Sequence, residues 1–174
     1  MTVSETEVIW RDSPAYEQAR IGRVFNHRRP DRYPHGVVEA TCVQDIINAV
    51  QLAKSQNLRV SVRSGGHSWA AWSVRDDAIL IDLGKYNFIE YDEETKIAKV
   101  SPSTTGRMLV EHLSTKDRMF GGGHCPDVGL GGFLLQGGMG WNCKVCVLFQ
   151  TLKSIANSLR IGDGLVNKLL QSMS

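Results

Sequence analysis

The sequence lacks the features that direct a chain to a membrane, to nucleic acid or to an oxidising compartment. Its 174 residues contain no apolar run long enough to span a bilayer, and the polar, acidic start MTVSETEVIW has no apolar core of a secretory signal. A net charge of +2 is too small to favour nucleic acid or an anionic membrane. The 4 cysteines are too scattered for a disulfide framework. We expect a cytoplasmic protein with neither nucleic-acid nor membrane partners.

Two common nucleotide-binding signatures are also missing. The sequence contains neither GxGxxG nor GxxxxGK[ST], which excludes the Rossmann and P-loop patterns. Cys143 and Cys146 form a CxxC, but without a second pair it is weak evidence for a metal, and we expect no metal site and a free thiol at Cys143. The composition, 42% hydrophobic and 22% charged, is that of a soluble domain able to bury a sizeable core.

The most unusual stretch that is present runs from Gly121 to Asn142, GGGHCPDVGLGGFLLQGGMGWN. It holds nine of the 17 glycines, yet large apolar residues separate them instead of the polar residues typical of a linker. Backbone N–H groups without covering side chains can face a ligand, so we predict the wall of a cofactor site. A tight set of buried turns explains the composition about equally well. The candidate cofactor-binding residues here are Gly123, Cys125, Val128, Gly129, Gly131, Gly132 and Gly138.

The first half of the chain predicts a strand–helix–strand unit. Residues 37–40 form a short apolar run suited to a buried strand. Thr41 and Gln44 have the spacing of a capping box, an apolar stripe follows at helical spacing, and Asn57 ends the helix. A strand is expected over residues 58–62, with one face formed by Leu58, Val60 and Val62.

A second candidate site follows this strand. A double glycine after a strand can form a nest of N–H groups that holds a pyrophosphate. A lone histidine is more often structural or on the surface than functional, but a place in this turn raises the odds for His67. The candidate cofactor-binding residues are Arg63, Ser64, Gly65, Gly66, His67 and Ser68.

The remaining pattern is of short strands with short connections. Strands are expected over residues 78–83, 87–91 and 97–101, and a helix capped by Thr104 or Thr105 is expected to run through Leu113. Residues 1–35 are interpreted as an N-terminal extension. Its arginine-rich segment, residues 20–32, is interrupted by prolines, and we expect a solvated turn in preference to a phosphate contact.

Together these motifs resemble a known family. The segments RSGGHSW, the Asp-Leu closing the next strand, and GGGHCPDVGLGGFLLQGGMGWN resemble, in order and spacing, the berberine-bridge-enzyme-like FAD-linked oxidoreductases of the vanillyl-alcohol-oxidase type. FNHRRPDRYPHGVVEA also fits the family's N-terminal pattern. The resemblance implies an α+β fold, a PCMH-type FAD-binding domain of two small sheets with flanking helices, over residues 36–174.

The resemblance also implies roles for two residues. In family members that have both, the histidine at the position of His67 bonds to the methyl group on the flavin's benzenoid ring, and the cysteine at the position of Cys125 bonds to the neighbouring ring carbon. Two bonds would hold FAD and raise its reduction potential. The alternative for Cys125 is a small buried hydrophobic residue. The implied activity is oxidation of a small organic substrate, with oxygen as acceptor, in secondary metabolism.

The resemblance stops near residue 145, beyond which only SLRIGDGLV still resembles the family's strand and turn. The rest of the flavin domain, the substrate domain and the family's catalytic base, usually a tyrosine, have no counterpart, so the catalytic residue is unknown. We expect a truncated FAD-linked oxidoreductase. The alternatives are a non-catalytic flavin-binding remnant or half of a split enzyme acting with a partner chain, and, more weakly, an NADPH-dependent flavin reductase of cell-wall precursor synthesis.

Overall fold

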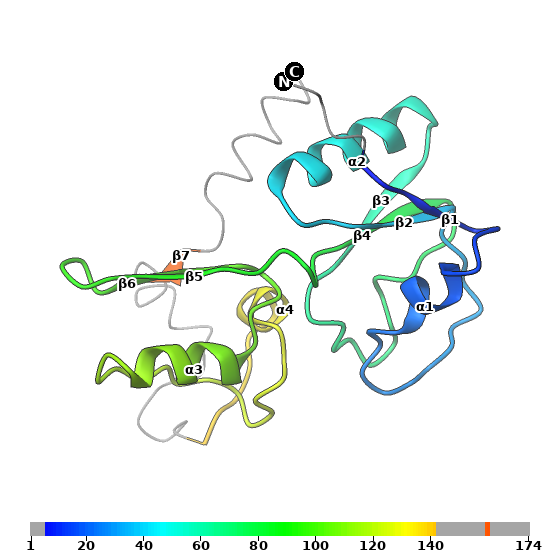
Figure 1. Ribbon diagram of the computed structural model, residues 1–174. Coiled ribbons are helices and arrows are strands. Elements are labelled where there is room, and N and C mark those ends of the chain that lie inside the picture. The colour runs from blue at the N-terminus through cyan, green and yellow to red at the C-terminus, as the bar shows by residue number, and fades with distance from the viewer. Residues whose placement is uncertain (1–5, 142–158, 161–174) are drawn as a thin grey trace. The chain divides into compact units, whose positions relative to one another are not determined.

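The computed structural model describes residues 6–141 and 159–160, which belong to two compact units (Figure 1). The first unit ends at Tyr86 and the second begins at Asn87. Each unit contains one small sheet and two helices. The expected α+β fold of two small sheets with flanking helices is therefore confirmed.

The sheet of the first unit has the order β1-β2-β4-β3. β2 and β3 both run parallel to β4, and β1 pairs antiparallel with β2. Every residue of β4 is buried, so this strand forms the centre of the unit. The strands are β1 (Ile9–Trp10), β2 (Gly36–Glu39), β3 (Arg59–Arg63) and β4 (Ala78–Asp82), and the helices are α1 (Tyr16–Ile21) and α2 (Val43–Ser55).

Helix α2 begins one residue later than the sequence predicts. Its N-cap is Cys42, and the side chain of Asp45, not of Gln44, completes the capping box. Asp45 also accepts hydrogen bonds from the backbone N–H and the hydroxyl of Thr41, both at 2.8 Å. Burial works to raise the pKa of Asp45, but these hydrogen bonds outweigh it and lower the pKa below its ordinary value. The predicted end at Asn57 is confirmed by its positive φ of 53°.

Strand β3 buries the polar face of its alternating pattern and exposes the apolar one. Ser61 and Arg63 are buried, whereas Val60 and Val62 are 40% and 53% exposed. The strand lies at the edge of the sheet, and its buried face is chosen by the ion pair that Arg63 makes with the neighbouring strand. The predicted alternation of these residues is therefore confirmed, and the structure buries the face that carries Ser61 and Arg63.

The arginine-rich N-terminal segment is packed into the first unit. Arg20 lies on α1, is 2% exposed and donates hydrogen bonds to the carbonyls of Pro30 and Arg32, each at 2.8 Å. A hydrogen bond to Glu17 raises the pKa of Arg20 and lowers that of Glu17. The expected solvated turn is wrong for Arg20, because turn carbonyls need donors and the guanidinium supplies them.

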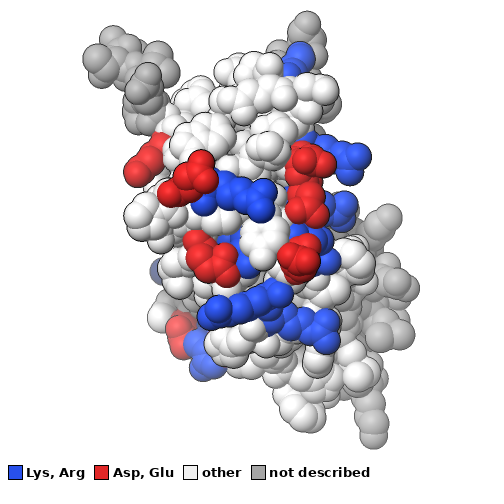
Figure 2. All heavy atoms as spheres, turned by 90° about the vertical axis from the view of Figure 1, so that its right-hand side faces the viewer, with Lys and Arg blue, Asp and Glu red and all other residues white. Residues whose placement is uncertain are grey.

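On the outer face in Figure 2, basic and acidic side chains lie among one another. This mixture agrees with the net charge of +2.

In the second unit, β6 (Ile97–Val100) pairs antiparallel with β5 (Ile89–Asp92) and parallel with β7 (Leu159–Arg160). The predicted helix is confirmed as α3 (Gly106–Ser114), where the hydroxyl of Thr105 accepts a hydrogen bond from the N–H of Met108. A further helix, α4 (Leu130–Gln136), lies within the glycine-rich stretch and was not predicted. Its buried Leu130 and Phe133 join Val100, Leu109 and Leu113 in one core.

Candidate functional site

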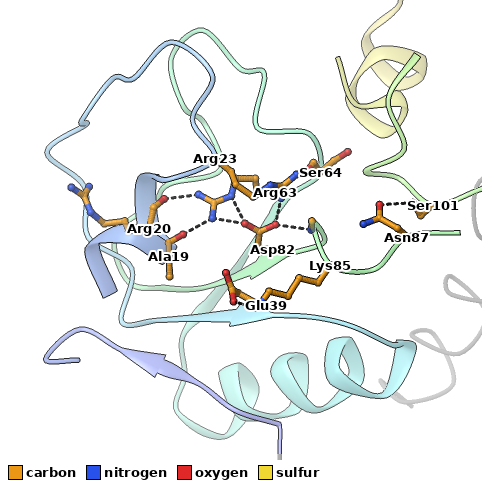
Figure 3. A network of polar contacts seen from close by, with 11 residues as sticks. Ala19, Arg20, Arg23, Glu39, Arg63, Ser64, Asp82, Lys85, Asn87 and Ser101 are labelled. Atoms are coloured by element: carbon orange, nitrogen blue, oxygen red, sulfur yellow. Dashed lines mark hydrogen bonds and ion pairs between the residues drawn. The ribbon is translucent and has the colours of Figure 1, made fainter. Parts of the chain in front are cut away.

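The glycine turn after β3 begins at a buried charge network (Figure 3). Arg63, the last residue of β3, donates from Nε to a carboxylate oxygen of Asp82 at 2.7 Å, and its terminal nitrogens donate to the carbonyls of Arg20 and Ala19. Asp82 also accepts hydrogen bonds from Arg23 and, at 2.7 Å, from the N–H of Gly84. Burial lowers the pKa of Arg63, while Asp82 opposes this shift.

The network defines what Arg63 can do for a cofactor. Its guanidinium is 1% exposed and bonds within the protein, so it cannot also reach a ligand. Contact with a cofactor would have to come from its main chain. The side chain instead fixes the end of β3, and therefore the start of the turn, against the end of β4.

Residues of the N-terminal segment hold the turn from the other side. Arg23 donates from its guanidinium to the carbonyl of Ser64 at 2.8 Å, and the N–H of Phe25 donates to the carbonyl of Gly66 at 3.2 Å. Gly66 has a φ of +73°, and a Cβ there would lie 1.8 Å from the carbonyl oxygen of Arg23. The close approach of the two backbones therefore explains why this position is glycine.

The same segment also holds the chain that follows the turn. Arg32 donates hydrogen bonds to the carbonyls of Val74, at 2.7 Å, and of Ala70 and Ala71. Arg23, Phe25 and Arg32 were not among the residues predicted to support this turn. For Phe25 and Arg32 the available signal was the agreement of FNHRRPDRYPHG with the family's N-terminal pattern; Arg23 lies outside that segment.

His67 and Ser68 lie in the middle of this supported turn. The imidazole of His67 is partly exposed and stacks on the ring of Phe25, with 4.0 Å between ring centroids. The hydroxyl oxygen of Ser68 accepts a hydrogen bond from the N–H of Trp72 at 3.2 Å. The turn is thus defined on both sides of the candidate attachment residue.

The glycine-rich stretch of the second unit serves packing at some positions. A Cβ on Gly123 or Gly138 would lie 2.8 Å or 2.0 Å from the ring of Phe133. The N–H of Gly131 donates to the carbonyl of Pro102 at 2.8 Å, so this group is already paired inside the protein. Gly129 forms a bridge with Thr105. For Gly123 and Gly138 packing against Phe133 therefore accounts for the glycine.

Gly132 is different. A Cβ built on it would meet nothing within 4 Å, although it lies inside α4, where glycine is less favourable than alanine. Packing within the described residues therefore gives no reason for this glycine, whereas the close approach of a bound group would. The open space beside Gly132 is compatible with a cofactor wall.

Cys125 lies on a loop anchored to the start of α3. Cys125 is exposed, and the two residues after it accept hydrogen bonds from Arg107. The N–H of Arg107 donates to the carbonyl of Pro126 at 2.8 Å, and its Nε donates to a carboxylate oxygen of Asp127 at 2.9 Å. The hydrogen bond to Asp127 raises the pKa of Arg107, with a smaller contribution from Cys125. Cys125 is not the buried hydrophobic residue of the alternative interpretation.

The candidates therefore fall on both units, six on the turn after β3 and seven in and around α4. Among residues 6–141 and 159–160, no three or more His, Cys, Asp or Glu side chains gather in a way that could hold a metal. Over the same part of the chain, no helix has the length and apolar character needed to cross a membrane.

Comparison with known proteins places these motifs in a family. Residues 34–161 match the FAD binding domain family, and the chain belongs to this family. The FAD-linked oxidoreductase penO of Penicillium crustosum is 50% identical over 136 residues, covering 78% of this chain and 30% of that protein. The chain thus spans about a third of the length of the curated relatives it matches.

Solved structures show the same fold. The berberine-bridge-enzyme-like protein 1 of Physcomitrella patens is similar with a TM-score of 0.72 and 27% identity, over 83% of this chain and 31% of that chain. The xylooligosaccharide oxidase of Myceliophthora thermophila, solved with xylobiose, has a TM-score of 0.72 and 29% identity, over 84% and 31%. The predicted resemblance to berberine-bridge-enzyme-like FAD-linked oxidoreductases is confirmed.

Proposed function

We propose that this chain is the flavin-attachment part of an oxidoreductase that oxidises a small organic substrate, with oxygen as the electron acceptor, in secondary metabolism. FAD is held covalently by His67 and Cys125. The observation that carries the proposal is that both residues lie on loops held by named contacts: His67 on a turn supported by Arg23 and Phe25, and Cys125 on a loop tied to Arg107. Both loops leave the candidate side chain accessible.

The other candidate residues have supporting roles in this proposal. The main chain of Ser64 to Ser68 would hold the pyrophosphate of FAD, because a glycine turn after a strand offers N–H groups to an anion. Gly132 leaves room for the cofactor at the surface of α4. When bound, FAD accepts a hydride from the substrate and passes the electrons on. Attachment would use the nucleophilic form of the Cys125 side chain, and the loop that carries Cys125 is tied to Arg107.

Peptide mapping of the purified chain tests the proposal. Trypsin places His67 in residues 64–75 and Cys125 in residues 119–144. If both residues are attached to one FAD, the intact mass rises by one FAD and these two peptides are isolated joined through it. His67→Ala should leave FAD only on residues 119–144, Cys125→Ser should leave it only on residues 64–75, and the double variant should carry none.

Two matched variants serve as controls. His124→Ala removes the histidine next to Cys125, and Cys42→Ser removes the second exposed cysteine among the described residues while keeping a residue suited to the helix cap. Both should retain the joined peptides. An unmodified intact mass for the flavin-saturated chain, or FAD attached elsewhere, would contradict the proposal.

A further inference from the structure

The ring of Phe25 fixes the imidazole of His67 in the first unit. The two rings are nearly parallel, with 11° between their planes and 4.0 Å between their centroids. The ring of Trp69 also contacts Phe25, in a T-shaped arrangement with 5.6 Å between the ring centroids. A face-to-face contact at this distance resists rotation of the imidazole, since turning the ring would drive its edge into the Phe25 face.

Backbone contacts hold Phe25 and His67 in register. The N–H of Phe25 donates to the carbonyl of Gly66 at 3.2 Å, directly before His67. The side-chain amide of Asn26 donates to the carbonyl of Trp69 at 2.9 Å, two residues after it. Phe25 and Asn26 are thus hydrogen-bonded to the turn on both sides of His67. These contacts fix the position of the Phe25 ring relative to the imidazole of His67.

We propose that Phe25 is a positioning residue that holds the His67 imidazole in the orientation required for its attachment to FAD. The inference rests on the proposed function. In the attachment, one imidazole nitrogen bonds to the methyl carbon of the benzenoid ring. The hydrogen of that nitrogen and one methyl hydrogen are lost, as two protons and two electrons. Molecular oxygen accepts the two electrons and the two protons and becomes hydrogen peroxide. Phe25 takes no part in the chemistry; it limits the imidazole to one ring plane.

The positioning role predicts a particular kind of defect. A near-attack orientation contributes to the rate of bond formation and much less to the affinity of the preceding complex. Removing the Phe25 ring should therefore slow attachment at His67 while leaving non-covalent FAD binding and the stability of the chain largely intact. A ring with a merely structural role would instead change all three together.

The test uses the full chain carrying Cys125→Ser, in which His67 is the remaining proposed attachment residue. Chain produced under riboflavin depletion is mixed with FAD, and the modified peptide 64–75 is followed by mass against time. Phe25→Leu should slow attachment by about tenfold or more, with the dissociation constant of the initial complex changed less than about threefold. Phe25→Tyr, which keeps the ring, should restore the rate. Trp10→Leu removes an exposed aromatic residue on β1, outside the turn and its supporting residues, and should leave the rate unchanged.

A second measurement does not depend on FAD. In NMR spectra of the flavin-free chain, the ring current of Phe25 should shift the carbon-bound protons of His67, and Phe25→Leu should abolish this shift while Phe25→Tyr keeps it. Absence of the shift in the parent chain would overturn the inference.

The results separate the two proposals. Suppose that the parent attaches FAD at His67. If Phe25→Leu attaches it equally fast, or loses affinity and stability together with attachment, the positioning role of Phe25 is wrong and the proposed function still stands. If the parent attaches no FAD at His67, the proposed function fails, and this inference fails with it.

Discussion

Arg63 and Asp82 form a buried ion pair in which the two side chains are 1% and 2% exposed. They stand opposite each other at the ends of the parallel strands β3 and β4. Asp82 also accepts hydrogen bonds from Arg23 and from the N–H of Gly84, which follows β4. This one carboxylate therefore connects the end of β3, where the glycine turn begins, with the end of β4 and the N-terminal segment. The turn after β3 is therefore held at its start by the Arg63–Asp82 ion pair and along its length by the side chains of Arg23 and Asn26 and the backbone N–H of Phe25.

Replacement of Asp82 by Asn should destabilise the chain strongly. The change leaves the buried guanidinium of Arg63 without a counter-charge, which costs about 3 kcal/mol or more. Urea unfolding followed by tryptophan fluorescence measures the free energy of unfolding. Asp77→Asn is the control, because the side chain of Asp77 is 83% exposed and its replacement should cost less than about 0.5 kcal/mol. Equal stability of the two variants would show that the pair contributes little.

Gly66→Ala should damage both folding and flavin attachment. The added methyl would be forced against the carbonyl of Arg23 in a backbone conformation with φ of +73°. The combined strain should lower the free energy of unfolding by about 2 kcal/mol or more. The same urea titration and the mass of peptide 64–75 after FAD addition measure the two effects. If the variant is as stable as the parent, the segments around Gly66 and Arg23 can move apart without a loss of folding free energy, and the expectation is wrong.

Gly132→Ala should separate stability from binding. Because the new methyl meets no protein atom and alanine favours a helix, the flavin-free chain should become more stable by up to about 1 kcal/mol. If the open space belongs to the cofactor, FAD affinity should fall by about tenfold, or about 1.4 kcal/mol. Fluorescence titration with FAD measures this. Glu111→Ala, at an exposed position on α3, is the control and should keep parental affinity. Unchanged affinity in Gly132→Ala would remove this residue from the site.

The stability difference between the parent and Asp45→Asn should depend on pH. Hydrogen bonds from Thr41 and Cys42 hold the pKa of Asp45 below its ordinary value of 3.8, against the effect of burial. The ionised cap therefore contributes fully above that ordinary value and loses its contribution as the pH falls through the lower, folded-state pKa. At pH 7 Asp45→Asn should cost about 1 kcal/mol, and the difference should shrink on acidification below the ordinary value. Urea titrations across the acidic range measure it; a constant difference would assign the effect to shape instead of charge.

Several features were determined by the sequence alone. The apolar run AILID and the helical stripe after residue 42 are local patterns, and the structure has β4 and α2 there. The motifs RSGGHSW and GGGHCPDVG identified the family and both attachment candidates, because side-chain chemistry and glycine spacing are properties of short segments.

Only the tertiary structure decided the rest. The sequence predicts that the strand after α2 alternates, but the face it buries depends on Arg63 finding Asp82 on the next strand. Arg20 looks like a solvated arginine until the turn carbonyls of residues 30 and 32 converge on it. The stacking of Phe25 on His67 likewise joins two segments that are distant in the sequence. The open space beside Gly132 exists only because that part of the glycine-rich stretch folds as a helix. Burial, ion pairing and ring contacts join residues far apart in the chain, so no local periodicity encodes them.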